Sequence, residues 1–285
     1  MGMEPTARQR DFLEVQCEEV LFGGAAGGGK SEALLMWLAE GVHVPSYSGI
    51  VFRRTYAQLE KSNESLVAKS QRMYRGLGGE YNASGHFWRF PSGARIEFGH
   101  LQHATSIYDY QGPAFHRCAF DELTQFTEDQ YLFMFSRQRA TTDFPLPMGT
   151  RATANPGGSG HGWVKRRFIS QEALSGIRGL DYREPSKPGL MFRIGDDRVF
   201  VPSRLADNPH LKFNEYVANL RKLNPIECER LLNGDWSIAE GLIFPEEWLR
   251  YYGSKGEMIG ALDDNRRMGI VEDCRRFKRF ATIDT

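Results

Sequence analysis

The feature that most constrains the fold of this chain is the segment Gly24–Ser31, whose sequence GAAGGGKS fits the pattern G-x-x-x-x-G-K-[ST]. It follows the apolar run Glu19–Phe22 and precedes a helical stretch from Lys30 to Glu40. Only glycine lets backbone N–H groups wrap closely around phosphate oxygens, and the helix N-terminus adds a favourable dipole. A strand, glycine loop and helix in this order predict an α/β P-loop nucleotide-binding fold.

The residues of this loop divide the binding of ATP and Mg²⁺ between them. Lys30 is expected to reach the β- and γ-phosphates, and the Ser31 hydroxyl to bind Mg²⁺. The backbone that surrounds the phosphates belongs to Gly24, Ala25, Ala26, Gly27, Gly28 and Gly29. A chance match is the alternative, and the position between a strand and a helix makes it rare. ATP and Mg²⁺ are therefore the expected cofactors.

A second chemical signal is the apolar run Cys118-Ala119-Phe120, which ends in the carboxylates Asp121 and Glu122. A strand that ends this way places Asp121 beside the metal and Glu122 where it polarises the attacking water. Taken alone, the pair also fits a solvated strand end. The P-loop about 90 residues upstream favours the catalytic interpretation.

Four further residues have both a functional and an ordinary interpretation. Gln9 suits recognition of an adenine edge, because an amide donates and accepts at once, but it also fits a plain surface glutamine. Arg137 and Arg139 suit insertion into a neighbour's phosphoryl-transfer site, or simple pairing with a helix C-terminal dipole. Asn155, after the strand 150–154, suits sensing of the γ-phosphate, or a simple Asn-Pro turn.

Charge and composition exclude some classes of protein. The chain has 36 Lys and Arg against 36 Asp and Glu, so contact with DNA requires a local patch. The basic cluster Lys165, Arg166 and Arg167 is a candidate for such a patch, with a solvated face as its alternative. No apolar run approaches the ~20 residues of a membrane span, so no membrane partner is expected. The four scattered cysteines predict reduced thiols in an intracellular protein.

Short apolar runs alternate with helical stretches, which predicts a mostly parallel sheet flanked by helices. Helices are predicted at 55–74, from Thr127 onward, at 211–223 and from Pro225 to Gly234. Strands are predicted at 49–53, 116–121 and 150–154, with a hairpin over 86–98. The segment 171–205, rich in Gly, Pro and Ser, has no predicted elements.

Over nearly all of residues 5–245, the chain resembles the ATPase domain of phage terminase large subunits. The resemblance implies an adenine-side glutamine, a P-loop, an Asp-Glu strand with its lead-in, a trans-acting arginine and a coupling motif. The matching segments are Gln9, Gly23–Ser31, Val51–Thr55, Gln111-Gly112, Asp121-Glu122, Ser136–Arg139 and Thr153–Pro156. The resemblance also implies a RecA-like (ASCE) P-loop fold with a small helical lid, to which it assigns Asp207–Pro209, Tyr216, Leu220, Leu232–Trp236 and Gly241–Phe244.

The resemblance implies three segments: an ATPase core at 1–200, a lid at 201–245, and a connector with the first strand of a truncated nuclease domain at 246–285. Asp284 matches the first nuclease metal ligand, but one carboxylate cannot build a two-metal site, so no nuclease activity is expected from this chain. Several relatives carry an arginine in the P-loop where this chain has Ala25 and Ala26. Arg53 and Arg54 are the candidates for that role.

The function implied by the resemblance is an ATP-hydrolysing motor that moves double-stranded DNA into a procapsid. Its expected partners are further copies of itself in a ring, the portal protein and the small terminase subunit, in the host cell cytoplasm. One alternative is a helicase-like translocase, although too little chain follows Asn155 for a second RecA-like domain. Another is an ATP-binding scaffold at the capsid vertex, against which Glu122 argues, because a scaffold has no need to activate water.

Overall fold

The structure is a computed structural model that describes residues 4–141, 143–238, 251–252 and 258–260. The chain divides into two compact units, residues 1–239 and 240–285. In the second unit, Tyr251–Tyr252 (β10) pairs antiparallel with Met258–Gly260 (β11). Asp284, assigned to the first strand of a nuclease domain, lies outside the described residues.

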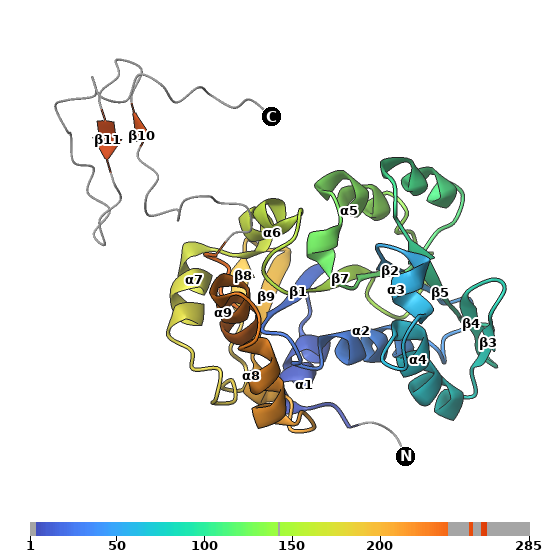
Figure 1. The fold of residues 1–285 in the computed structure, drawn as a ribbon. Coiled ribbons are helices and arrows are strands. Elements are labelled where there is room, and N and C mark those ends of the chain that lie inside the picture. The colour runs from blue at the N-terminus through green and yellow to red at the C-terminus, as the bar shows by residue number, and fades with distance from the viewer. Residues whose placement is uncertain (1–3, 142, 239–250, 253–257, 261–285) are drawn as a thin grey trace. The chain divides into compact units, whose positions relative to one another are not determined.

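The first unit is built on a nine-stranded sheet with the order β3-β4-β5-β2-β6-β7-β1-β9-β8 (Figure 1). The six strands from β5 to β9 in this order are parallel, while β3, β4 and β8 pair antiparallel at the two edges. The prediction of a mostly parallel sheet is confirmed. The strands are β1 (Glu19–Gly24), β2 (Ser48–Arg53), β3 (Glu80–Asn82), β4 (Phe87–Arg89), β5 (Arg95–His100), β6 (Arg117–Phe120), β7 (Gly149–Ala154), β8 (Phe192–Ile194) and β9 (Arg198–Ser203).

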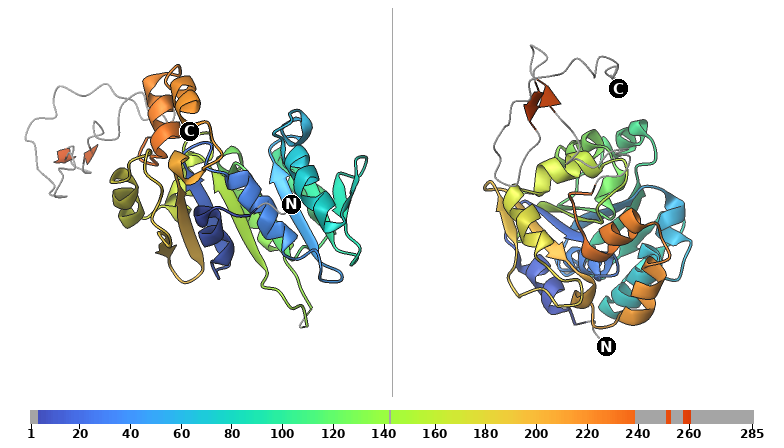
Figure 2. Two further views of the ribbon diagram at one scale, coloured as in Figure 1. Left: turned by 90° about the horizontal axis from the view of Figure 1, so that it is seen from below. Right: turned by 60° about the vertical axis from the view of Figure 1, so that its left-hand side comes forward.

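Helices cover both faces of this sheet (Figure 2), because the central strands are apolar on both sides. Val20 and Phe22 pack with one set of helices, whereas Leu21 between them packs with the other. The first set is α1 (Ala7–Glu14), α2 (Lys30–Ala39) and α4 (Leu66–Tyr74). The second set is α5 (Glu128–Phe135), α6 (His161–Phe168) and α7 (Gln171–Arg178). Each large apolar side chain buried in this way contributes about 1.5–3 kcal/mol.

Two further helices, α8 (Phe213–Leu220) and α9 (Pro225–Asn233), form a small apolar cluster of their own. This cluster contains Ala25 of the P-loop, so the helices predicted as a lid pack directly against the phosphate-binding segment. Pro225 stands at the first turn of α9, and Gly234 ends that helix with a φ of 67°. Among the described residues, no helix has the length and apolar character needed to cross a bilayer.

Two predictions about the chain needed correction or completion. The single helix predicted at 55–74 is wrong: α3 (Tyr56–Glu60) ends at Lys61, and Ser65 starts α4 by accepting a hydrogen bond from the Ala68 backbone N–H. The unassigned segment 171–205 contains α7, β8 and β9, and β9 pairs directly with β1. The hairpin of β4 and β5 and the helix that begins after Thr127 are as predicted.

Candidate nucleotide-binding site

Apart from Gln9 in α1 and the two arginines Arg137 and Arg139, the residues predicted to handle the nucleotide lie at or just after the carboxyl ends of neighbouring parallel strands. The P-loop follows β1, Asn155 follows β7, Asp121 and Glu122 follow β6, and Arg53 ends β2. Parallel strands that lie side by side end at the same edge of the sheet, which is where ligands bind in such folds. Since β7 lies between β1 and β6, Asn155 stands between the glycine loop and the carboxylates.

The P-loop is fixed at its last glycine by Gln9. Gly29 has a φ of +73°, and a Cβ there would lie 2.8 Å from Gln9 Nε2, so glycine is required. Gln9 Nε2 donates to the Gly29 carbonyl at 2.8 Å, while its Oε1 accepts from the Thr6 backbone N–H at 2.9 Å. Gln9 is buried, and its amide ties helix α1 to the start of α2. Its predicted contact with adenine stays a prediction.

Lys30 is buried inside the loop that it closes. Its Nζ donates to the Ala25 carbonyl at 2.5 Å, which bridges the two ends of the P-loop. Burial lowers the pKa of Lys30 to about 8, although the negative charges of Glu122 and Asp121 oppose the shift. The buried positive charge of Lys30 therefore lies beside the glycine loop, where the negative charge of a bound phosphate would compensate it.

We expect Lys30→Met to raise the melting temperature of the nucleotide-free protein at pH 7. The folded protein binds this proton less tightly than the unfolded chain, so charged Lys30 costs folding free energy below pH 8, and that cost shrinks as the pH rises toward 10.5. Thermal melts of both proteins at pH 7 and pH 10 test this. A Lys30→Met variant whose advantage did not shrink at pH 10 would contradict it.

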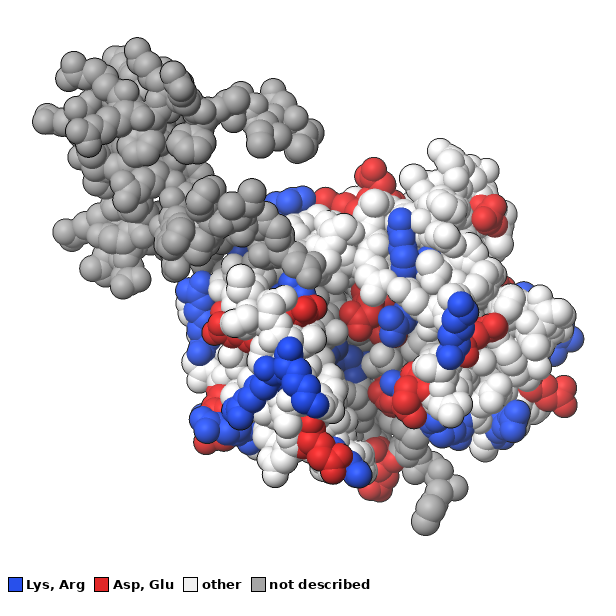
Figure 3. All heavy atoms as spheres, viewed as in Figure 1, with Lys and Arg blue, Asp and Glu red and all other residues white. Residues whose placement is uncertain are grey.

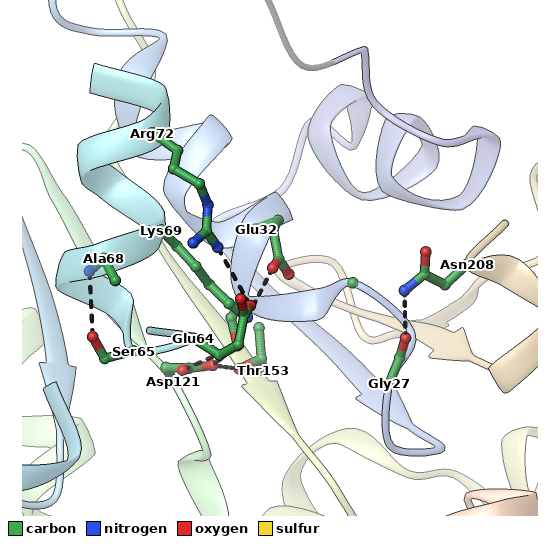
Figure 4. A network of polar contacts seen from close by, with 12 residues as sticks. Gly27, Glu32, Glu64, Ser65, Ala68, Lys69, Arg72, Asp121, Thr153 and Asn208 are labelled. Atoms are coloured by element: carbon green, nitrogen blue, oxygen red, sulfur yellow. Dashed lines mark hydrogen bonds and ion pairs between the residues drawn. The ribbon is translucent and has the colours of Figure 1, made fainter. Parts of the chain in front are cut away.

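Asp121 makes several polar contacts in this site, and Figure 4 shows the one with Thr153. Ser31 Oγ lies 3.0 and 3.1 Å from its two carboxylate oxygens, and Thr153 Oγ1 donates to its Oδ1. Arg53 Nη2 forms an ion pair with its Oδ2 at 2.7 Å. The P-loop hydroxyl and the strand-end carboxylate thus meet, as the motif spacing predicted.

The donors at Asp121 suit magnesium. A hydroxyl and a carboxylate are the hard oxygen ligands that Mg²⁺ prefers, and in nucleotide sites one or two such protein ligands suffice, because phosphates and water complete the octahedron. Ser31 and Asp121 fit a metal brought in with the nucleotide.

Glu122 has an unusual backbone conformation, with φ 60° and ψ 59°. A non-glycine residue in this left-handed region costs on the order of 1–3 kcal/mol, and such residues concentrate at functional sites. Its N–H donates to Thr153 Oγ1 at 3.3 Å, and its carboxylate accepts from Asn155 Nδ2 at 3.3 Å. Desolvation and the neighbouring Asp121 charge raise the pKa of Glu122, while the positive charges of Lys30 and Arg53 oppose this rise. A raised pKa makes it a stronger base at neutral pH.

Two contacts join the P-loop to the segment predicted as a lid. Asn208 Nδ2 donates to the Gly27 carbonyl at 2.7 Å, as Figure 4 shows, and the Ala26 N–H donates to the Leu231 carbonyl of α9 at 2.9 Å. The side chains of Leu211 and Tyr216 also pack at Gly27. The loop that would hold phosphate therefore shares hydrogen bonds with α9 and with the turn before α8.

A second connection runs from Asn155 to the same helices. The Gly157 N–H donates to His161 Nδ1 at 2.9 Å, and the His161 ring stacks on the fully buried Trp236, which follows α9. The guanidinium of Arg230, on α9, lies so close to Gly157 that any side chain there would collide with it. The loop after β7 is thus in contact with α9 at Arg230, and it is linked to Trp236 through His161 of α6.

Arg137 and Arg139 lie at the opposite edge of the sheet. Their backbones pair with Phe115, two residues before β6, and Phe115 is roughly 20 Å from Asp121 at ~3.3 Å per residue. Arg137 is held by the Gln111 carbonyl and by Ser136 Oγ. Arg139 is exposed, and its side chain makes no hydrogen bond or ion pair within the described ranges. Neither arginine reaches the nucleotide site of its own chain.

The basic cluster on α6 has mixed surroundings. Arg167 forms a bidentate pair with buried Glu19 at 2.6 and 2.8 Å, so it serves the packing of α6 on β1. Arg166 is exposed and approaches Glu128 at 3.4 Å. Figure 3 shows basic and acidic side chains interspersed on one face of the molecule, as expected from the zero net charge. Among the cluster, Arg166 has the most solvent-exposed charge.

Sequence reasoning assigned no role in the site to Arg230, and it named Thr153 only as part of the coupling motif and Asn208 only as part of the lid. Thr153 touches both Asp121 and Glu122. Its signal was present, because it lies two residues before Asn155 on a strand between the two motifs. Arg230 gave no signal, since its contact with Gly157 joins positions more than 70 residues apart in the chain.

Comparisons with known proteins agree with this geometry. The large terminase of a thermophilic bacteriophage superposes with a TM-score of 0.60 at 13% identity, over 82% of this chain and 54% of that chain. The same protein in complex with ADP gives 0.57 at 14%, over 81% and 54%. The HK97 bacteriophage large terminase gives 0.51 at 14%, over 82% and 50%. These similarities show the fold, and the chain spans about half the length of these proteins. No curated protein matches the sequence.

The profile of the family described as "Terminase large subunit, T4likevirus-type, N-terminal" matches residues 21–251. The matched region runs from β1 through the P-loop, the Asp-Glu strand and the helices α8 and α9. It covers well over half of the 285 residues. The chain therefore belongs to the family of terminase large-subunit N-terminal domains.

Proposed function

We propose that this chain is the ATP-hydrolysing motor domain of a DNA-packaging terminase, which moves double-stranded DNA into a procapsid. The observation that carries the proposal is the meeting of Ser31 Oγ with Asp121 at 3.0 Å, with Glu122 next in the chain. A hydroxyl for Mg²⁺, a metal-binding carboxylate and a second, more basic carboxylate at one strand edge are the parts that ATP hydrolysis needs. ADP and ATP-γ-S are bound in structures of the thermophilic-phage terminase, which supports the choice of nucleotide.

The residues of the site divide the reaction as follows. Lys30 leaves the Ala25 carbonyl to bind the β- and γ-phosphates, and the glycine backbone surrounds these phosphates. Gln9 supports the loop on the side where the adenine would bind. Ser31 and Asp121 hold Mg²⁺, which when bound neutralises charge on the phosphate oxygens. Glu122 accepts a proton from the attacking water, and its raised pKa suits that role.

We propose that Arg139, from a neighbouring subunit of a ring, completes the site. Its distance from the carboxyl edge of its own sheet supports action in trans rather than in cis. Arg137 is tied to Gln111 and Ser136, whereas the exposed Arg139 has no such ties among the described residues, so Arg139 is the one available for insertion. An arginine supplied in trans is worth about 10³–10⁵ in rate.

Release of the γ-phosphate is proposed to move α8 and α9. Asn155 contacts the carboxylate of Glu122, and two residues later Gly157 lies against Arg230 of α9. A shift of Asn155 therefore displaces Arg230 and, through His161, Trp236. Because α9 and Asn208 also bond the P-loop, the same movement changes the grip on the nucleotide.

The partners proposed are double-stranded DNA, further copies of this chain, the portal protein and the small terminase subunit, in the host cytoplasm. DNA would be gripped through its phosphates, which needs no reading of bases. Arg166 is the part of the α6 cluster proposed to contribute, because its side chain is 72% exposed, whereas Arg167 is committed to Glu19.

The experiment that tests this function measures single-turnover ATP hydrolysis while the protein concentration is raised. Because a trans arginine is required, the rate constant per subunit is expected to rise by at least about 10³-fold as rings assemble. Sedimentation at the same concentrations reports assembly. A rate constant that stayed flat through assembly would contradict the ring motor, no hydrolysis at all would favour a scaffold, and stimulation by single-stranded DNA alone would favour a helicase.

A further inference from the structure

Arg53 occupies a position in the site that the motifs do not explain. It ends β2, the strand next to β6, and the Asp121 N–H donates to the Phe52 carbonyl at 3.0 Å, so strand pairing continues up to this point. The pairing brings Arg53 Nη2 to within 2.7 Å of Asp121 Oδ2. The Asp121 side chain is 1% exposed and that of Arg53 20%, so the ion pair is shielded from solvent.

The neighbouring Arg54 serves a different purpose. Its Nη1 donates to the Leu101 carbonyl at 2.7 Å and to Gln130 Oε1 at 3.0 Å, which ties β2 to the turn after β5 and to α5. Of the two adjacent arginines at the end of β2, only Arg53 contacts a residue of the nucleotide site within the described part of the chain. The structure thus separates the two arginines by role.

The contacts of Asp121 leave little room for a metal ion beside Arg53. Its Oδ1 accepts from Ser31 and Thr153, and its Oδ2 accepts from Ser31 and faces the Arg53 guanidinium. A buried carboxylate without a counter-ion is costly, and Arg53 removes that cost. Mg²⁺ needs an oxygen lone pair at about 2.1 Å and carries two positive charges, so it repels a guanidinium on the same carboxylate.

We propose that Arg53 is a displaceable counter-ion of Asp121. It neutralises the carboxylate while no metal is bound, and it must leave Asp121 when Mg²⁺ arrives with the nucleotide. Arg53 therefore competes with Mg²⁺ and sets the magnesium concentration at which the motor loads. This role rests on the proposed function, because it assumes that Asp121 holds the metal.

The test measures binding of a fluorescent ADP at saturating nucleotide while Mg²⁺ is titrated. Arg53→Gln removes the competing charge, so the half-saturating Mg²⁺ concentration is expected to fall on the order of tenfold. Arg53→Lys keeps the charge and is expected to stay closer to the wild type. Arg72→Gln is the matched control, because Arg72 is an exposed arginine paired with exposed Glu64, and it is expected to change nothing.

The counter-ion role alone would be overturned if wild-type protein bound ADP and the Arg53→Gln variant needed as much Mg²⁺ as the wild type, or more. If wild-type protein bound no ADP at any Mg²⁺ concentration, the proposed function itself would fail, and this role with it. If Arg53→Gln did not fold, arginine-side-chain NMR of wild-type protein decides, with the signal assigned by Arg53→Lys. Hindered exchange of the Arg53 guanidinium is expected to disappear on adding Mg²⁺-ADP, and its persistence would overturn the role.

Discussion

Replacing Glu122 by glutamine is expected to lower ATP turnover by about 10²- to 10⁴-fold, the usual contribution of a general base. Affinity for Mg²⁺-ADP is expected to stay within about twofold, because Glu122 faces the water and not the metal. The variant should fold, since a glutamine oxygen still accepts the hydrogen bond that Asn155 Nδ2 now donates to Glu122. Single-turnover hydrolysis with parallel ADP titration measures both quantities.

The pH profile gives this prediction an independent check. The pKa of Glu122 is raised mainly by desolvation and then by Asp121. As the pH falls, hydrolysis should therefore be lost at a higher pH than the pKa of an ordinary glutamate would predict. The residual rate of Glu122→Gln should lack that acidic limb. Normal turnover in a folded variant, or an unchanged acidic limb, would show that another group activates the water.

The second large effect is expected from Arg139→Ala, which should lower turnover by about 10³- to 10⁵-fold in assembled rings. The free monomer should be little affected, because Arg139 lies at the far edge of the sheet from its own nucleotide site. The sharpest measurement mixes two inactive proteins. A Glu122→Gln subunit still supplies Arg139 to a neighbour, and an Arg139→Ala subunit still has its own base, so mixed rings should regain activity.

Arg137→Ala is the matched control, with the same charge removed two residues away. Its contacts with Gln111 and Ser136 predict a modest effect on local packing and no complementation by Glu122→Gln. Recovery of activity with Arg137→Ala and not with Arg139→Ala would assign the trans role to Arg137. Failure of both mixtures, with rings confirmed by sedimentation, would exclude an arginine from this segment.

The nucleotide site was predictable because its parts lie in short motifs. The P-loop, Asp121 and Glu122 each sit at the end of an apolar strand, and parallel strands bring their carboxyl ends to one edge whatever the loops between them do. The meeting of Ser31 with Asp121, 90 positions apart, follows from that rule alone. The motifs at the strand ends and the alternation of strands and helices were therefore enough to predict a mostly parallel sheet and the residues at the centre of the site.

Contacts that depend on register and on side-chain reach were beyond the sequence. Arg53 and Arg54 are adjacent and chemically identical, and only the pairing of β2 with β6 and β5 determines which one meets Asp121. Strand β9 escaped notice because Pro202 and the Gly-rich segment before it break the apolar pattern. The predicted helix at 55–74 failed because capping at Ser65 is a local choice that outweighs the longer periodicity.

The central claim is that the glycine loop and the acidic strand end together bind a magnesium nucleotide. Calorimetric titration of ADP into wild-type protein and into Lys30→Met, each with Mg²⁺ and with a chelator, tests it most directly. One ADP per chain is expected to bind to wild-type protein in a Mg²⁺-dependent manner, with no measurable binding to the variant. Absence of binding to folded wild-type protein, or equal binding to Lys30→Met, would contradict the claim.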